Sequence, residues 1–282
     1  MLARVMLHSH QRTLAGAALL LLGTRAHAQT DYFNTDAGRP LTIEDAYALE
    51  RRSIELQGAP LRVERIRGGQ YRWGIEPELS IGLFPRTQIE VGVPLVYVDD
   101  APRGTRRAGA AGVDLSVLYN LNRETSIPAL AVGVGALLPA GSLGPRDPYG
   151  NAKVVLTRSL PAFRVHANAQ VTVGPRLSLP AGSPDPIGGN TLELSRWLAG
   201  VAVDRTLPLR SMLFAAEVFA RAPLVQGQPL EWNAGVGTRW QADVRWAMDA
   251  GVGRHLTGND RGWYLTLGGA YALGWPWRPP RR

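Results

Sequence analysis

Cysteine is absent from the 282-residue chain, and lysine occurs once, at Lys153. Without cysteine the chain has no disulfide framework, no thiolate metal ligand and no catalytic thiol. The formal net charge of +8 is therefore carried almost entirely by arginine. These arginines do not cluster into a basic stripe interleaved with aromatic residues, so the sequence gives no support to nucleic-acid binding.

Long apolar runs are also missing after the N-terminus. The first 28 residues contain Arg4 and Arg12, then an apolar run from Leu14 to Leu22, and end on Ala26-His27-Ala28. This pattern predicts a secretory signal peptide, residues 1–28, which is cleaved on export; a retained membrane anchor is the alternative. No later stretch reaches 18 consecutive apolar residues, so the exported chain either is soluble or crosses a membrane with strands.

What the chain has instead is a repeat of period two. In residues 71–97 apolar side chains such as Trp73, Ile75 and Val91 alternate with polar ones such as Glu76 and Glu90. A strand places successive side chains on opposite faces, so this alternation predicts strands with one apolar and one polar face. The pattern recurs clearly at 113–121, 163–173, 232–240, 244–252 and 263–275, and more weakly at 126–138, 151–160, 192–206 and 211–221. The first segment, 53–65, breaks phase at Gly58-Ala59-Pro60, which indicates a β-bulge.

These segments predict an all-β fold, an up-and-down antiparallel transmembrane β-barrel of about 12 strands over residues 53–275. Short and long connections alternate along the chain, as periplasmic turns and outer loops do in such barrels. All but one of the eight tryptophans fall on the apolar phase, mostly near strand ends. A soluble sandwich, the alternative, would place large side chains in the middle of its strands. The expected membrane-interface aromatics are Trp73, Tyr97, Tyr119, Trp197, Trp232, Trp240, Trp246, Trp263, Tyr271 and Trp275.

The polar phase is expected to face the barrel interior, because a midplane arginine facing lipid costs about 2–4 kcal/mol. The expected lumen-lining residues are Arg72, Glu76, Glu78, Glu90, Asp114, Lys153, Arg164, His166, Arg196, Arg239, Arg245 and Asp249. The acids gather on early strands and Lys153, Arg164 and Arg196 on later ones, so an acidic wall is expected to face a basic wall. Eight strands are just filled by side chains and 16–18 leave an aqueous channel, so 12 strands leave both an open and a filled lumen as alternatives.

The two ends of the mature chain carry separate signals. Residues 29–52 form the expected periplasmic leader, in which Thr42 and Asp45 resemble a capping box and predict a short helix from Ile43 to Arg51. This leader is either a frayed extension or a plug in the periplasmic mouth. At the other end, the steps between Thr266, Gly268, Tyr271 and Leu273 resemble the signal by which the barrel-assembly machinery recognises a last strand. A C-terminal tail, residues 276–282, follows that strand.

Several stretches resemble one family. "GRPLTIEDAYALERRSIEL", "RWGIEPELSIGLFPRTQIEVGVPLVYV", "AGVDLSVLYNL" and "PALAVGVGALLPAG" are similar to the MetA-pathway of phenol degradation family, over roughly residues 38–140. The resemblance implies an outer-membrane β-barrel that admits small solutes, including aromatic or other organic compounds. It implies no particular binding residue.

The sequence therefore predicts a channel or transporter for uptake of small solutes in the cell outer membrane, in contact with its lipid and needing no cofactor or metal. A structural or surface-binding barrel with a filled lumen is one alternative, and a barrel-embedded lipid hydrolase is another. The mature chain has two histidines, His166 on the polar phase and His255 in an expected outer loop. Because no nucleophile motif, phosphate-binding loop or metal-ligand cluster accompanies them, a non-enzymatic role is predicted.

Overall fold

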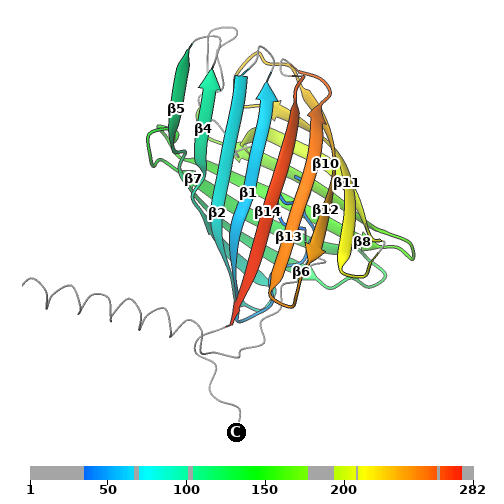
Figure 1. Ribbon diagram of the computed structural model, residues 1–282. Coiled ribbons are helices and arrows are strands. Elements are labelled where there is room, and N and C mark those ends of the chain that lie inside the picture. The colour runs from blue at the N-terminus through cyan, green and yellow to red at the C-terminus, as the bar shows by residue number, and fades with distance from the viewer. Residues whose placement is uncertain are drawn as a thin grey trace, which may run out of the picture.

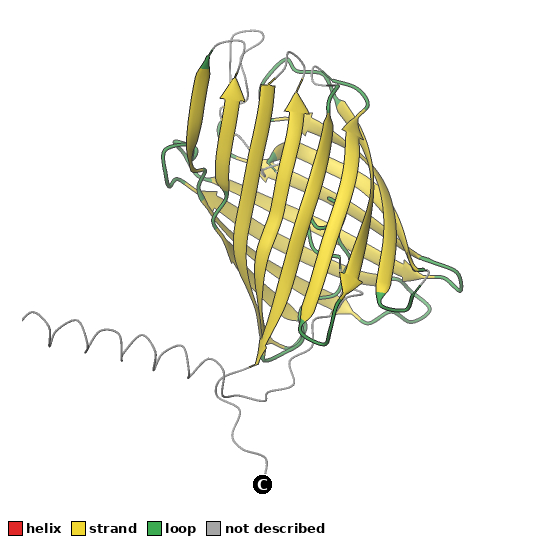
Figure 2. Ribbon diagram, viewed as in Figure 1, coloured by secondary structure: helices red, strands yellow, loops and turns green. Residues whose placement is uncertain are grey.

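The computed structural model describes residues 35–66, 70–100, 104–176, 194–207, 209–258 and 261–274. These residues form a closed antiparallel β-barrel of 12 strands, which confirms the predicted fold class. Figure 2 draws strands and loops in these ranges and no helix, and none of their segments is a helix able to cross a membrane. The predicted signal peptide, Trp275, the C-terminal tail and most of the loop 174–194 lie outside the described residues.

Because two of the strands are interrupted, the 12 barrel strands are built from 14 strand segments. They are β1 (Ser53–Ile66), β2 (Gln70–Phe84), β3 (Thr87–Gly92), β4 (Leu95–Asp100), β5 (Thr105–Ala110), β6 (Val113–Asn122), β7 (Ala129–Leu138), β8 (Tyr149–Ser159), β9 (Arg164–Val173), β10 (Ser195–Thr206), β11 (Met212–Pro223), β12 (Glu231–Gln241), β13 (Trp246–His255) and β14 (Trp263–Gly274). β1 pairs with both β2 and β14, which closes the barrel (Figure 1).

Two of the barrel strands are interrupted. β3 and β4 pair with successive parts of β2, so they form one strand broken at Val93 and Pro94. β5 and β6 continue each other in the same way, broken at Ala111 and Gly112. Pro94 has no N–H to give to the ladder, and Gly112 adopts a φ of 128°, which favours glycine. The predicted bulge in β1 is confirmed, because the register shifts between Gly58 and Leu61 in the pairing with β2 and between Gln57 and Leu61 in the pairing with β14.

The two ends of the barrel differ. At one end, called the terminal end here, β1 begins, β14 ends and the turns are short: 85–86, 123–128, 160–163, 207–211 and 242–245. At the opposite, loop end, the connections 139–148, 174–194, 224–230 and 256–262 are longer, although β1 and β2 are joined there by three residues and β4 and β5 by four. This alternation is the one predicted for periplasmic turns and outer loops.

The outer face is apolar and carries aromatic side chains in two bands. Trp73 lies opposite Tyr97 in the ladder near the loop end, and Trp246 lies opposite Tyr271 near the terminal end, with ring centroids 4.7 Å apart. Trp197, Trp232 and Trp263 are also near the loop end, whereas Tyr119 and Trp240 are near the terminal end. Apolar side chains between the bands are exposed, among them Val201, Val236 and Leu267. The barrel thus presents the surface that a bilayer requires.

Candidate functional site

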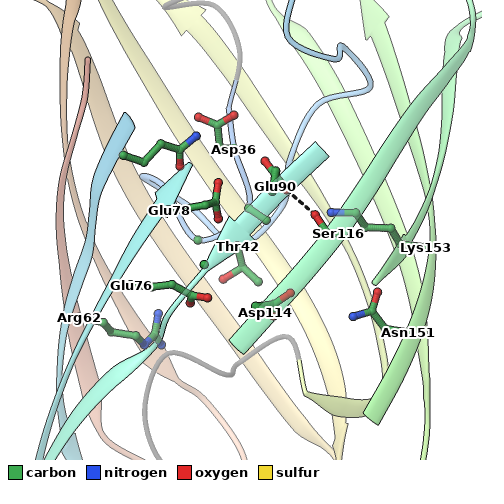
Figure 3. Close-up of a pocket in the computed structure, with 14 residues that line it drawn as sticks. Asp36, Thr42, Arg62, Glu76, Glu78, Glu90, Asp114, Ser116, Asn151 and Lys153 are labelled. Carbon is green, nitrogen blue, oxygen red and sulfur yellow. Dashed lines mark hydrogen bonds between the residues drawn. The ribbon is translucent and has the colours of Figure 1, made fainter. Parts of the chain in front are cut away.

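Four acidic side chains lie on neighbouring strands of the barrel wall. Glu76 and Glu78 lie on β2, Glu90 on β3 and Asp114 on β6, which are neighbouring strands. Gly92 pairs with both Glu78 and Asp114, so the carboxylates meet over a glycine. Together they line a pocket, with Lys153 of β8 on its other side (Figure 3).

Glu78 and Glu90 receive hydrogen bonds from neutral donors. Ser80 donates to Glu78 at 2.9 Å and lies 3.5 Å from Glu90. Ser116 donates to the other oxygen of Glu90 at 2.6 Å, and the Gln88 amide also donates to Glu90. Within the described residues neither carboxylate forms an ion pair.

The basic residues on the later strands do not form an uncompensated wall, so this part of the expectation is corrected. Arg164 contacts Asp204 through two hydrogen bonds of 2.9 and 2.6 Å. Lys153 Nζ lies 2.6 Å from Glu44 Oε1. Arg196 donates to backbone carbonyls near the loop end, including that of Thr172 at 3.1 Å. Each positive charge has an acceptor close by, which weakens any field across the lumen.

Of the lumen candidates that remain apart from His166, three lie on barrel strands and the fourth, Arg245, does not. Arg72 lies 3.6 Å from Glu64 on β1, and Arg239 and Asp249 are buried at the terminal end. Arg245 departs from its predicted place in the lumen wall. It lies in the turn before β13, and its guanidinium is 3.5 Å from the hydroxyl of the outer-face residue Tyr271.

Residues 35–50, called the N-terminal segment here, lie inside the barrel in its terminal half. The predicted helix from Ile43 to Arg51 is wrong, because residues 43–50 form no regular secondary structure. Four of their backbone N–H groups donate to lumen side chains instead of to carbonyls one helical turn earlier, and those of Asp45 and Tyr47 donate within the segment. The wall thus supplies the hydrogen bonds that a helix would have supplied internally.

Backbone anchors of the N-terminal segment come from strands all around the barrel. The N–H groups of Thr42 and Ile43 both donate to Glu217 Oε2, at 2.8 and 2.9 Å. Four further contacts are Glu44 N to Asn168 Oδ1 (3.0 Å), Ala46 N to Thr157 Oγ1 (2.9 Å), Leu49 N to Gln88 Oε1 (2.6 Å) and Thr266 Oγ1 to the Pro40 carbonyl (3.0 Å). These side chains belong to five different strands, so the segment crosses the whole lumen.

Apolar contacts and small residues complete the fit. Leu41 and Ile43 are buried against a cluster that includes Leu198 and Phe219. A Cβ at Gly237 would stand 2.7 Å from Pro40 Cβ, and one at Gly251 would stand 2.5 Å from the Pro40 carbonyl oxygen. These two glycines therefore leave the space that Pro40 occupies.

Charged residues hold the start of the segment. Arg39 is buried and contacts Asp36 at 2.5 Å, Asp249 at 3.3 Å and Glu55 at 3.7 Å. Arg239 contacts the same Asp36 carboxylate at 3.1 Å. A buried pair that loses one partner leaves an uncompensated charge, so this cluster resists withdrawal of the segment.

The end of the segment contacts a turn. The Tyr47 hydroxyl donates to Glu124 Oε2 at 3.2 Å, and Ser159 N donates to Glu124 Oε1 at 2.7 Å. Burial and the neighbouring Glu124 carboxylate raise the pKa of Tyr47 to about 12. Burial alone raises the pKa of Glu124, but the hydrogen bonds from Ser159 and Tyr47 outweigh it, so the pKa of Glu124 is lowered.

His166 connects the wall to the segment. Its Nδ1 lies 3.0 Å from Thr157 Oγ1 and its Nε2 lies 3.0 Å from Asp204 Oδ2. The Thr157 hydroxyl, the His166 imidazole and the Asp204 carboxylate are linked in the same order as the three groups of a hydrolase triad. However, Thr157 is 0% exposed and its oxygen accepts the Ala46 N–H, so no substrate reaches it while the segment is in place.

Sequence reasoning missed several lumen residues. Asp36, Arg39 and Glu44 were assigned to a leader of undefined position, and Arg62 and Glu64 lie after the bulge, where β1 changes phase. The bulge itself was the signal that could have placed Arg62 and Glu64 inward. His255, expected in a loop, ends β13 and points inward, 3.9 Å from Glu64.

No family model matches the chain, so its resemblance to the MetA-pathway of phenol degradation family stays a prediction. No curated protein matches it either. Among solved structures, the barrel is similar to the COG4313 outer membrane channel from Pseudomonas putida F1. The two chains are 12% identical, with a TM-score of 0.55 over 81% of this chain and 98% of that one.

Two other barrels are similar to a lesser degree. The NanC porin is 9% identical, with a TM-score of 0.50 over 77% of this chain and 98% of that one. Outer membrane phospholipase A from Escherichia coli is 9% identical over 88% of this chain and 98% of that one, but its TM-score of 0.41 supports no argument. At these identities, the likeness to the COG4313 channel and to the NanC porin shows the fold alone.

Proposed function

We propose that the protein is an outer-membrane channel for the uptake of small polar solutes, with the N-terminal segment as a plug in its periplasmic half. The observation that carries the proposal is the lumen itself. A closed barrel with an apolar outer face encloses charged side chains, and a pocket lined by Glu78, Glu90 and Lys153 opens beside the segment. A purely structural barrel has no need of such an interior.

The likeness to solved channels supports this proposal at the level of the fold. The similar proteins are described as an outer membrane channel and a porin. The family resemblance suggests aromatic solutes, whereas the carboxylates and hydroxyls of the pocket favour polar, positively charged groups. We therefore place polar solutes before aromatic ones.

Assembly belongs to the same proposal. Export by a cleaved signal peptide, followed by recognition of Thr266, Gly268, Tyr271 and Leu273 by the barrel-assembly machinery, would bring the chain to the outer membrane. Of these residues, Thr266 points inward and binds the N-terminal segment. A Thr266→Ala change would therefore loosen the segment, whereas a Tyr271→Ala change would affect assembly alone.

A permanently filled barrel is the second candidate. It is favoured by the number of wall strands that bind the segment and by the burial of Arg39. In that case the lumen would conduct nothing, and the outer loops would carry the function.

Single-channel recording in planar bilayers separates the two candidates. The chain from residue 29 onward is compared with one that lacks residues 29–50, both shown to be folded. The channel proposal expects discrete current steps that become larger or more frequent after deletion. Silence from both folded proteins would exclude the channel.

A further inference from the structure

One end of the lumen pocket is lined by carboxylates, and two of them accept hydrogen bonds from neutral donors only, among the described residues. Glu78 and Glu90 approach the same Ser80 hydroxyl and accept only neutral donors in the part of the chain that the structure describes. Glu76 and Asp114 add two more carboxylates to the same lining. Two close carboxylates of this kind attract a cation, and an ammonium group can donate to both.

The other end offers a positively charged donor held in one position. Arg62 Nε donates to Glu64 at 2.6 Å, and its guanidinium lies 3.8 Å from the centre of the Tyr264 ring. Arg62 is 4% exposed and lines the pocket, yet its Nη2 has no hydrogen-bond partner among the described residues. A buried donor without a partner is costly, and a ligand oxygen would relieve that cost.

The ion pairs around Arg62 also favour the binding of an anionic group there. Arg62 and Arg72 both approach Glu64, so two guanidinium groups share one carboxylate there. The pocket therefore holds two carboxylates with neutral donors, Glu78 and Glu90, and a guanidinium with an unpartnered Nη2, Arg62. In Figure 3, Arg62 and Glu78 lie toward opposite ends of the same row of lining side chains, with Glu76 between them.

We propose that this pocket binds a small zwitterionic amine, with its ammonium group at Glu78 and Glu90 and its carboxylate at Arg62. The proposal rests on the proposed channel, because the solute reaches the pocket along the same lumen, and it names the class of solute that the channel selects. Asp36 and Thr42 of the N-terminal segment also line the pocket. A bound solute thus touches the segment as well as the wall.

Isothermal titration calorimetry of the folded chain in detergent at low salt tests the proposal with three probes of four carbon atoms each. These are 4-aminobutyrate, butylammonium and butyrate. We expect 4-aminobutyrate to bind about tenfold more tightly than either single-charge probe, since each charged group adds charge-assisted hydrogen bonds. Equal binding of butyrate and 4-aminobutyrate, or binding of none of the three, would overturn the proposal.

Variants locate the site. Glu78→Gln with Glu90→Gln should weaken 4-aminobutyrate binding about tenfold or more and leave butyrate binding unchanged. Glu50→Gln, the same change at an exposed position outside the pocket, should alter neither. If the double variant does not fold, Glu78→Gln alone carries the test, and unchanged affinity would overturn the assignment.

The outcome is separable from that of the channel proposal because calorimetry requires no ion conduction. A chain that conducts but does not bind 4-aminobutyrate refutes the site and leaves the channel. A chain that binds it but never conducts refutes the channel and leaves a binding barrel.

Discussion

At the scale of single residues, Glu217 is the anchor that most clearly ties the wall to the N-terminal segment. One of its carboxylate oxygens accepts two successive backbone N–H groups, from Thr42 and Ile43. Hydrogen bonds to a charged acceptor contribute roughly 1.5–3 kcal/mol each. Neither partner is readable from the sequence, because residues 42 and 217 are brought together only by closure of the barrel.

Replacing Glu217 with glutamine should loosen the segment. The amide keeps the size of the side chain but loses the charge, so we expect the Thr42 and Ile43 amides to exchange about tenfold faster or more. Hydrogen–deuterium exchange of the folded protein in detergent measures this. Glu90→Gln is the matched control, since Glu90 accepts no N–H of the segment. Equal exchange in all three proteins would show that Glu217 does not hold the segment.

Glu124 makes one contact of the segment dependent on pH. Its pKa is lowered below its ordinary value of 4.5, so its ionised form is favoured in the folded protein. The stability that it adds is complete above pH 4.5 and is lost as pH falls through the lowered pKa. The difference in unfolding free energy between the parent and Glu124→Gln should therefore be constant near neutrality and shrink in acid. A difference that does not change with pH would contradict this role.

At the scale of secondary-structure elements, alternation predicted the strands because a membrane barrel has two chemically distinct faces along every strand. The prediction of a helix failed because side chains of the barrel wall replaced the hydrogen bonds within a helix. The stretch from Ile43 to Glu50 has a helix-like start, but Asn168, Thr157 and Gln88 satisfy its backbone. In β1 the sequence predicts the bulge but not the inward direction of Arg62 and Glu64 after it.

The outer face gives a prediction at this scale. Val201 lies in the middle of β10 on the outer face, and Val173 ends β9 at the loop end. Val201→Arg should lower the free energy of unfolding from lipid vesicles by about 2–4 kcal/mol, and Val173→Arg by about 0–1 kcal/mol, because the cost depends on depth in the bilayer. Equal costs at both positions would mean that β10 does not cross the hydrocarbon layer as described.

At the scale of the whole molecule, the fold could be predicted from the sequence, the acidic side of the lumen stays a prediction from alternation, and the contents of the lumen could not be predicted. Parity along a strand places a side chain on a face. It does not say which side chains meet across the barrel, such as Arg39 with Asp249. Those long-range contacts turn a set of strands into a barrel that contains part of its own N-terminus.

In the proposed channel, the N-terminal segment lies in the conduction path. Because the chain has no cysteine, an engineered pair is unique. Pro40→Cys with Gly237→Cys places the new thiols close together, since a Cβ at Gly237 would be 2.7 Å from Pro40 Cβ. A shift of about 1 Å gives the separation that a disulfide needs.

The most direct measurement is the single-channel current of this double variant before and after reduction, with Pro40→Cys alone as the control. The account predicts that the oxidised protein is closed and that a reductant restores current steps like those of the control. Identical current in the oxidised and reduced states would show that the segment does not obstruct the lumen, and would contradict the account.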